Sequence, residues 1–251
     1  MHRFFIPHDE IRSKGYVLSG PQWHHGKTVL RLTEGDRLSV FDGEGNEYLV
    51  SLDRATPHEA HLHVLSHTKT PKLPYSMTLF QALPKNKTMD MIIQKATELG
   101  VSEIRPILSD RSVVRMNSDE ASEKIQRWHQ ISIEAAKQCG INWLPKIGSI
   151  QTVKEVCSQK LSYSLALIGS LQSEAKPLWN YLESNSIPLT KVAIMIGPEG
   201  DFTPAEIGQA RSAGFQPLSL GPLVLRSDTA VIYAMSILSY ELNKTYKNLS
   251  K

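Results

Sequence analysis

Over the first seventy positions, hydrophobic and polar residues alternate in short runs, a pattern typical of strands with one buried face. Turn residues separate the runs, first DGEGN at 42–46 and then RATPHE at 54–59. One stretch with helical spacing, WHHGKTVLRL at 23–32, interrupts them. This rhythm predicts a small β-barrel or open sheet. The expected strands are RLSVF at 37–41, EYLVSL at 47–52 and HLHVLS at 61–66.

After the linker SHTKTPKLPYS at 66–76, which holds two prolines, the pattern changes to alternating strands and helices. A helix is expected from Thr88, its cap, to the terminating Gly100, and a second over 119–139. The pattern predicts a β-barrel domain at 1–70 and a parallel-sheet α/β domain at 75–251. Strands are expected at 77–83 and 101–108, and buried parallel strands at 163–169 and 191–197. One face of the first helix is expected to carry Met89, Ile92, Ile93, Ala96 and Leu99, and the second helix carries at helical spacing Ile125, Trp128, Ser132, Ala135, Ala136 and Cys139.

The composition is that of an ordinary globular chain: 251 residues, 41% hydrophobic and 21% charged. The net charge of +3 permits an anionic partner without identifying a nucleic acid. No apolar run approaches bilayer length, so a cytoplasmic protein without a membrane partner is expected. Cys139 and Cys157 lack ligand spacing, and the histidines of HLH at 61–63 lack nearby cysteine or carboxylate support. Neither a disulfide framework nor a metal site is therefore expected.

A glycine loop follows the last of these strands, in IMIGPEGDFTPAEI at 194–207. Thr203 and Glu206 have the spacing of a capping box, and Pro204 suits the first helical position. The loop GPEGD at 197–201 then lies at the carboxyl edge of a parallel sheet, where ligands bind. It matches neither the phosphate loop GxxxxGK[ST] nor GxGxxG, and a plain strand-to-helix turn remains the alternative.

A second glycine loop follows in SLGPLVLRSDTA at 219–230. Arg226 immediately precedes a helix start at which Ser227 or Asp228 can cap. A guanidinium there can bind an anionic or polar ligand group, whereas a surface salt bridge is the alternative. Two such loops at successive strand ends converge on one edge of the sheet, which favours a single pocket.

The pair IGPEGDFTPAEI and LGPLVLRSDTA closely resembles the signature of the RsmE family, SPOUT-superfamily methyltransferases that form 3-methyluridine in small-subunit ribosomal RNA. The resemblance extends over nearly the whole chain, through HHGKTVLRLTEGDRLSVFDG, QALPKNKTMDMIIQKATELGVSEIRPILSDRSVVR and EAAKQCG. It implies an N-terminal PUA-like β-barrel that helps bind RNA, an α/β SPOUT domain with a C-terminal trefoil knot, and a homodimer. It also implies that both glycine loops hold S-adenosylmethionine, at Leu167, Ile196, Gly197, Pro198, Glu199, Gly200, Leu220, Gly221, Leu225 and Arg226.

On this resemblance, Arg226 is the candidate for stabilising the anion that develops on the uracil ring as its N3 proton leaves. Asp228 could orient Arg226 or accept the proton, and helix capping is its simpler role. Glu199 could contact the cofactor or the substrate, or it could only satisfy backbone donors of its own loop. The candidates for contacts with the phosphates of small-subunit rRNA, free or within the assembled subunit, are Lys85, Lys87, Arg105, Arg111 and Arg115, each with solvated surface charge as the alternative.

The chain departs from the family pattern where arginine is common, with Leu223 in the last loop and Ile141–Asn142 after the QCG motif; Asp228 replaces a usual glutamate. Lost positive charge could weaken RNA contacts or shift the target. A non-catalytic RNA-binding or ribosome-assembly protein on the same fold is therefore the second hypothesis. A nucleotide-binding enzyme of doubly wound type is the third, and the absence of a phosphate-loop motif weighs against it.

Overall fold

The computed structural model describes residues 1–85, 88–112, 117–183 and 189–249, which form two compact units. The first unit comprises Met1–Lys72 with Ile133–Leu144, and the second comprises Leu73–Ser132 with the remainder of the chain from Pro145. Residues 133–144, which the sequence pattern assigned to 75–251, thus group with the N-terminal strands. No helix in the described ranges combines the length and the apolar character that crossing a membrane requires.

The first unit is a five-stranded sheet with the order β1-β3-β4-β5-β2, two helices of its own and the end of the long helix α4 (Ser118–Cys139). Only the β1–β3 pair is parallel. The three predicted strands are confirmed as β3, β4 and β5, and the predicted helix at 23–32 instead begins at Gly20, with Pro21 in its first turn. The alternation of β3–β5 encloses an apolar core around Trp23. The elements are β1 (Arg3–Phe5), α1 (His8–Lys14), β2 (Val17–Ser19), α2 (Gly20–Thr28), β3 (Arg37–Phe41), β4 (Asn46–Ala55) and β5 (Glu59–Lys69).

Arg3 explains why the end of the long helix belongs to this unit. Its guanidinium donates hydrogen bonds to the carbonyl oxygens of Ala136 (2.6 Å), in the last turn of that helix, and Ile141 (3.0 Å), just beyond its end. The guanidinium also lies 4.0 Å from the centre of the Phe41 ring. Ile133 packs in the same apolar cluster as Phe41.

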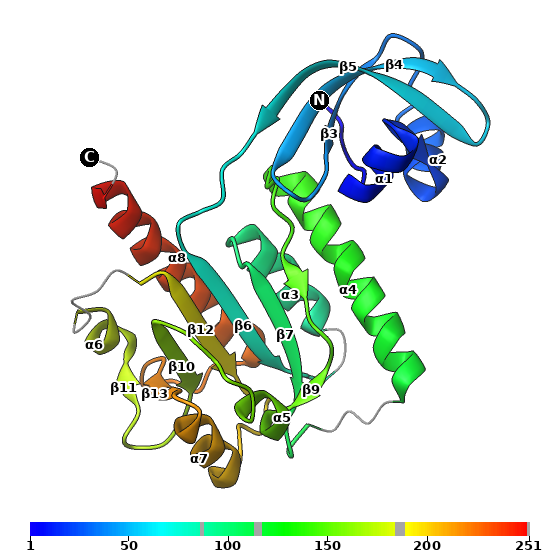
Figure 1. Ribbon diagram of the computed structural model, residues 1–251. Coiled ribbons are helices and arrows are strands. Elements are labelled where there is room, and N and C mark those ends of the chain that lie inside the picture. Colours follow the sequence, from blue (N-terminus) through cyan, green and yellow to red (C-terminus); the bar gives the residue numbers. More distant parts are fainter. Residues whose placement is uncertain (86–87, 113–116, 184–188, 250–251) are drawn as a thin grey trace. The chain divides into compact units, whose positions relative to one another are not determined.

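The second unit is an eight-stranded sheet in which every pairing is parallel (Figure 1). Its main order is β11-β13-β10-β12-β6-β7-β8, and β9 pairs with β7. The predicted parallel-sheet α/β class is therefore confirmed. The elements are β6 (Ser76–Ala82), α3 (Thr88–Glu98), β7 (Glu103–Leu108), α4 (Ser118–Cys139), β8 (Lys146–Ile147), β9 (Gln151–Thr152), α5 (Val153–Cys157), β10 (Leu165–Gly169), β11 (Lys176–Pro177), α6 (Leu178–Glu183), β12 (Lys191–Ile196), α7 (Pro204–Ser212), β13 (Gln216–Ser219) and α8 (Ser227–Leu249).

Alternate residues of the central strands pack on opposite faces of this sheet. Val192 and Ile194 of β12 join the core beneath α3 and α8, whereas Ala193 and Met195 join the core beneath α5 and α7. The face predicted for α3 is confirmed, with four of its five residues fully buried and Leu99 partly so. On α4 the pattern fails only at its end, where Cys139 is exposed.

Candidate functional site

A cleft of about 320 Å³ lies at the carboxyl ends of β10, β12 and β13. Those strands are neighbours in the sheet, so the loops that follow them meet at one edge, as the two glycine loops predict. The lining residues come from three loops and the start of α8: Gly169, Ser170, Leu171, Gln172, Ile196, Gly197, Pro198, Glu199, Asp201, Leu218, Ser219, Leu220, Gly221, Pro222, Leu223, Val224, Leu225, Ser227 and Ala230.

The first glycine loop, residues 197–203, is locally self-supporting. The backbone N–H of Asp201 donates to the carbonyl oxygen of Pro198 at 2.9 Å, and Asp201 itself has φ 58°, in the left-handed region. The predicted capping box is confirmed, with Thr203 accepting from the backbone of Glu206 and Glu206 accepting from that of Thr203. Glu206 is buried and also accepts the backbone N–H of Asp110 at 2.9 Å, which ties the loop after β7 to the start of α7.

Two further contacts hold this loop to segments that carry predicted RNA-binding residues. Glu199 Oε1 accepts the backbone N–H of Lys85 at 3.1 Å. Arg111 Nη1 donates to the carbonyl oxygen of Gly200 at 2.8 Å, and a Cβ at Gly200 would meet the Arg111 side chain at 3.5 Å. Glu199 therefore satisfies a backbone donor, as one sequence-based hypothesis expected, but the donor belongs to another loop.

The second glycine loop, residues 220–226, is far more open. Gly221 has φ 114°, a conformation that disfavours any side chain, and it lies in open space. Leu223 is 72% exposed and Val224 is 77% exposed. The two loops are joined just beyond its end, where the hydroxyl of Ser227 donates to the carbonyl oxygen of Gly197 at 2.9 Å.

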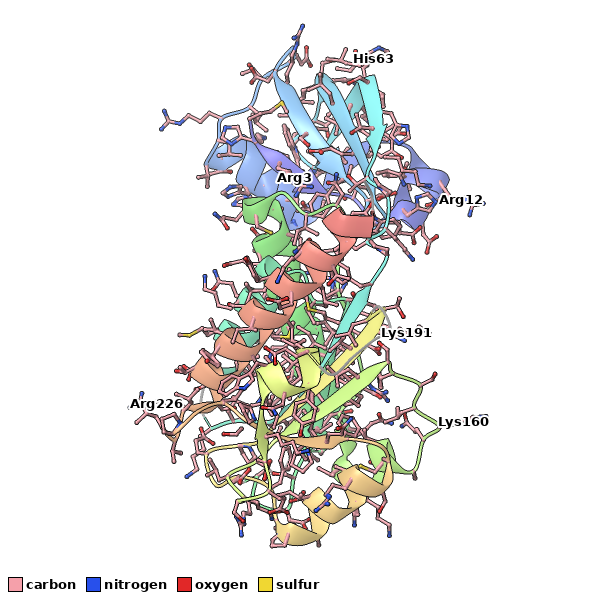
Figure 2. All side chains as sticks on the ribbon, turned by 90° about the vertical axis from the view of Figure 1, so that its left-hand side faces the viewer. Arg3, Arg12, His63, Lys160, Lys191 and Arg226 are labelled. Carbon is pink, nitrogen blue, oxygen red and sulfur yellow. The ribbon has the colours of Figure 1, made fainter. Side chains whose placement is uncertain are left out.

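Arg226 lies at the position before the first residue of α8, and Figure 2 shows its side chain projecting from the surface. It is exposed, and no carboxylate of the described residues pairs with it, so the salt-bridge alternative is not supported. Asp228 Oδ1 accepts the backbone N–H of Thr229 at 2.8 Å, within the first turn of α8. That contact suits a carboxylate near a helix N-terminus.

The cleft contains seven of the ten predicted cofactor residues: Ile196, Gly197, Pro198, Glu199, Leu220, Gly221 and Leu225. Leu167 is instead fully buried in the core, and Gly200 and Arg226 are not among the lining residues. The third loop, Gly169–Gln172, was not predicted from the sequence. The end of strand 163–169 on a glycine followed by serine was an available signal.

The predicted RNA-binding residues lie in different environments. The side chains of Lys85 and Arg111 are exposed. Arg105 is partly buried: its Nη2 donates to Gln151 (2.7 Å) and Gln159 (2.6 Å), and its guanidinium lies 5.0 Å from the centre of the Phe80 ring. Lys87 and Arg115 lie outside the described residues.

The charges of the cleft select the kind of ligand that fits. Glu199 and Asp201 place two carboxylates at its wall, and the residues that line it include no lysine or arginine. Leucine and isoleucine side chains supply apolar surface for a ring. A cationic sulfonium with an adenosine group, as in S-adenosylmethionine, fits this set, whereas the phosphates of a nucleotide would meet uncompensated negative charge. Nor do three or more His, Cys, Asp or Glu side chains of the described residues cluster in a way that could hold a metal.

Two family profiles cover most of the chain. The profile described as an RNA methyltransferase domain matches residues 71–239, and the one described as an RNA methyltransferase PUA domain matches residues 18–65. The N-terminal sheet is therefore a PUA-like domain, as the resemblance implied.

Similar proteins from several bacteria agree with these profiles. Ribosomal RNA small subunit methyltransferase E of Synechocystis sp. is 32% identical over 94% of this chain and 76% of its own length, and that of Mesomycoplasma hyopneumoniae is 32% identical over 94% and 98%. The crystal structure of the Neisseria gonorrhoeae enzyme of the same name, bound to S-adenosyl methionine, has a TM-score of 0.82 at 31% identity, covering 96% of this chain and 97% of that one. A Legionella pneumophila protein in complex with the same cofactor has a TM-score of 0.84 at 31% identity, covering 95% and 96%. The chain belongs to the RNA methyltransferase family, among the ribosomal RNA small subunit methyltransferases E.

Proposed function

We propose that this protein transfers the methyl group of S-adenosylmethionine to N3 of a uridine in the 16S RNA of the small ribosomal subunit. The observation that carries the proposal is the cleft itself, which has an apolar floor, two carboxylates and no lysine or arginine among its lining residues. This favours a cationic adenosyl cofactor over a phosphorylated one. When bound, the cofactor supplies a methyl group already activated on a sulfonium.

The residues of the chain would then have to activate the nucleophile. A uracil N3 attacks well only as its proton leaves, so the negative charge that develops on the ring needs a fixed positive partner. Arg226 is a suitable one, because it is unpaired among the described residues and borders the cleft between Leu225 and Ser227, which both line it. Asp228, the second residue of α8 and two positions after Arg226, is our candidate for accepting the proton.

The RNA would approach over the loops after β6 and β7. Lys85 and Arg111 are exposed there, and each is hydrogen-bonded to the cofactor loop, through its backbone or its side chain. Such cations neutralise phosphates, and the PUA-like domain would supply further contacts. A uridine must leave its base stack to reach a cleft of this kind, which favours a loop or junction in the RNA as the target.

Exposed apolar residues on α8 and on the second glycine loop support a homodimer. Tyr233 and Tyr240 are 46% and 67% exposed on α8, spaced to share one helical face, and Leu223 and Val224 project from the neighbouring loop. A second copy of the chain would cover these side chains and bring its own surface close to Arg226.

The expected trefoil knot would include both glycine loops. From β12 the chain continues through α7 to β13 on the far side of β10, and then returns as α8 to pack against α3 and β12. A return of this kind supports the proposed knot, in which β12, β13 and α8 hold the cleft together.

The test is an incubation of the purified protein with methyl-labelled S-adenosylmethionine and small ribosomal subunits that lack the modification, followed by digestion of the RNA to nucleosides. Label in 3-methyluridine is the expected result. Cofactor binding without label would point to another RNA substrate. Neither binding nor label, with RNA still bound, would favour the non-catalytic RNA-binding protein, and binding of ATP or NAD would favour the nucleotide enzyme.

A further inference from the structure

Gln81 is a polar side chain in a position that packing alone would assign to a hydrophobic one. It stands next to last in β6 and is fully buried. Since side chains alternate along a strand, it shares a face with Met77 and Leu79, whose partners are the apolar residues beneath α3 and α8. A buried amide requires hydrogen-bond partners, so the contacts of Gln81 indicate what it is for.

The hydrogen bonds of Gln81 lead to both glycine loops. Its Nε2 donates to the carbonyl oxygen of Ala82 at 2.7 Å and to Ser227 Oγ at 2.9 Å. The Ala82 carbonyl can only accept, which fixes the orientation of the amide. Because Ser227 accepts from Gln81, its single hydroxyl proton is donated to Gly197. The chain of bonds therefore has one direction, from β6 through the first residue of α8 to the first residue of the loop after β12.

The other end of the amide is not satisfied. Gln81 Oε1 is buried and accepts no hydrogen bond from the described residues. An unpaired buried acceptor destabilises the folded state, so an apolar side chain of the same size would serve the core at least as well. Departures from packing rules of this kind are expected where a function depends on them.

We propose that Gln81 is a positioning residue for methyl transfer. Through Ser227 it fixes Gly197 at the wall of the cofactor cleft and also fixes the start of α8, where Arg226 lies. Gln81 contacts neither cofactor nor RNA. It acts by keeping the two glycine loops in a fixed position relative to each other. This inference rests on the proposed function and deepens it.

Gln81→Met tests the proposal, because methionine has a similar volume and flexibility but donates no hydrogen bond. The temperature of unfolding is expected to stay unchanged or to rise, since the unpaired acceptor is gone. The dissociation constant of S-adenosylhomocysteine is expected to rise about fivefold and kcat to fall about tenfold. Unchanged affinity and kcat, or a lowered unfolding temperature with an unchanged kcat per folded molecule, would overturn the proposal.

Ser227→Ala breaks the same chain of bonds from its other end. If the three groups act as a unit, the double variant with Gln81→Met loses about as much affinity and kcat as the more damaging single variant. Losses that multiply would show that the two residues act separately and would contradict the inference. If Gln81→Met does not fold, Ser227→Ala alone carries the test, and unchanged affinity and kcat in that variant would overturn the proposal.

Thr78→Val is the matched control. It removes a buried hydroxyl from the same strand, on the face that packs toward α5 and α7, and should leave affinity and kcat as in the unaltered protein. The dissociation constant of S-adenosylhomocysteine also separates the two proposals. If the unaltered protein forms no 3-methyluridine, the proposed function fails, whereas affinities altered by Gln81→Met and Ser227→Ala would still support the chain of bonds.

Discussion

The two glycine loops of the cleft both contain a Gly-Pro pair, but they differ in how firmly the surrounding residues hold them. Residues 197–203 are held by a capping box at their end, by the Asp201–Pro198 backbone bond, and by contacts from Lys85 and Arg111. Residues 220–226 expose a leucine and a valine, and the backbone N–H of Gly221 donates to the hydroxyl oxygen of Ser219 at 3.3 Å. Residues 197–203 therefore form a preformed loop, whereas residues 220–226 form an open loop whose apolar side chains remain uncovered.

This difference suggests a division of tasks within one site. A preformed loop offers fixed dipoles and carboxylates without reorganisation when a ligand arrives, which suits recognition of the cofactor. An open loop with exposed apolar side chains gains stability when a second surface buries them, at about 25 cal/mol per Å². It therefore suits the place where RNA and a second subunit meet the cofactor. Substitutions in the two loops should therefore impair different properties of the protein.

The largest effect is expected from Arg226→Ala in the open loop. If Arg226 stabilises charge in the transition state only, its loss should lower kcat about 100-fold, the effect of removing about 3 kcal/mol of preorganised electrostatic stabilisation. The dissociation constant of S-adenosylhomocysteine should change less than twofold. Single-turnover methylation and equilibrium binding measure the two quantities separately.

Arg226→Lys is the control, since it keeps the charge and loses the planar fork of donors. Partial recovery of kcat would attribute the role to charge, and no recovery would attribute it to geometry. If Arg226→Ala released the cofactor instead, Arg226 would be a binding residue, and the contrast between the two loops would disappear.

A second substitution in the open loop tests what covers it. Leu223→Asp with Val224→Asp places two charges on side chains that are now 72% and 77% exposed, so the isolated chain should fold as before. Charges cannot be buried against a second copy without a large desolvation penalty, so the dimer should dissociate. Sedimentation of the two proteins at equal concentration measures this. A substituted protein that remains dimeric would remove this loop from the proposed interface.

Sequence patterns predicted those parts of the site that depend on residues near one another in the chain. The Thr203–Glu206 capping box, the start of α8 after Arg226 and the strands around the cleft are local, so spacing revealed them. The third loop, Gly169–Gln172, reaches the cleft because β10 lies between β12 and β13, an order that no local pattern encodes.

The burial of single residues and their hydrogen-bond partners could not be predicted from local sequence patterns either. Gln81 and Ser227 are separated by 146 positions and meet only through the return of α8. Leu167 and Gly169 lie two residues apart, but Leu167 is fully buried in the core and Gly169 lines the cleft. The shortest elements, such as β8, β9 and β11 with two residues each, carry too few side chains for any periodicity.

The smallest effect is expected in the preformed loop, from Glu199→Gln compared with Glu199→Ala. The glutamine keeps an oxygen that can accept the backbone N–H of Lys85, whereas alanine removes the acceptor. If Glu199 acts mainly through this bond, Glu199→Ala should raise the dissociation constant of S-adenosylhomocysteine about fivefold and Glu199→Gln less than twofold. S-adenosylhomocysteine lacks the sulfonium charge, so repeating the titration with S-adenosylmethionine isolates the electrostatic contribution. A Glu199→Gln that binds the charged cofactor as weakly as Glu199→Ala does would mean that the carboxylate serves the cofactor directly. The preformed loop would then be held by the Arg111 contact, the Asp201–Pro198 backbone bond and the capping box.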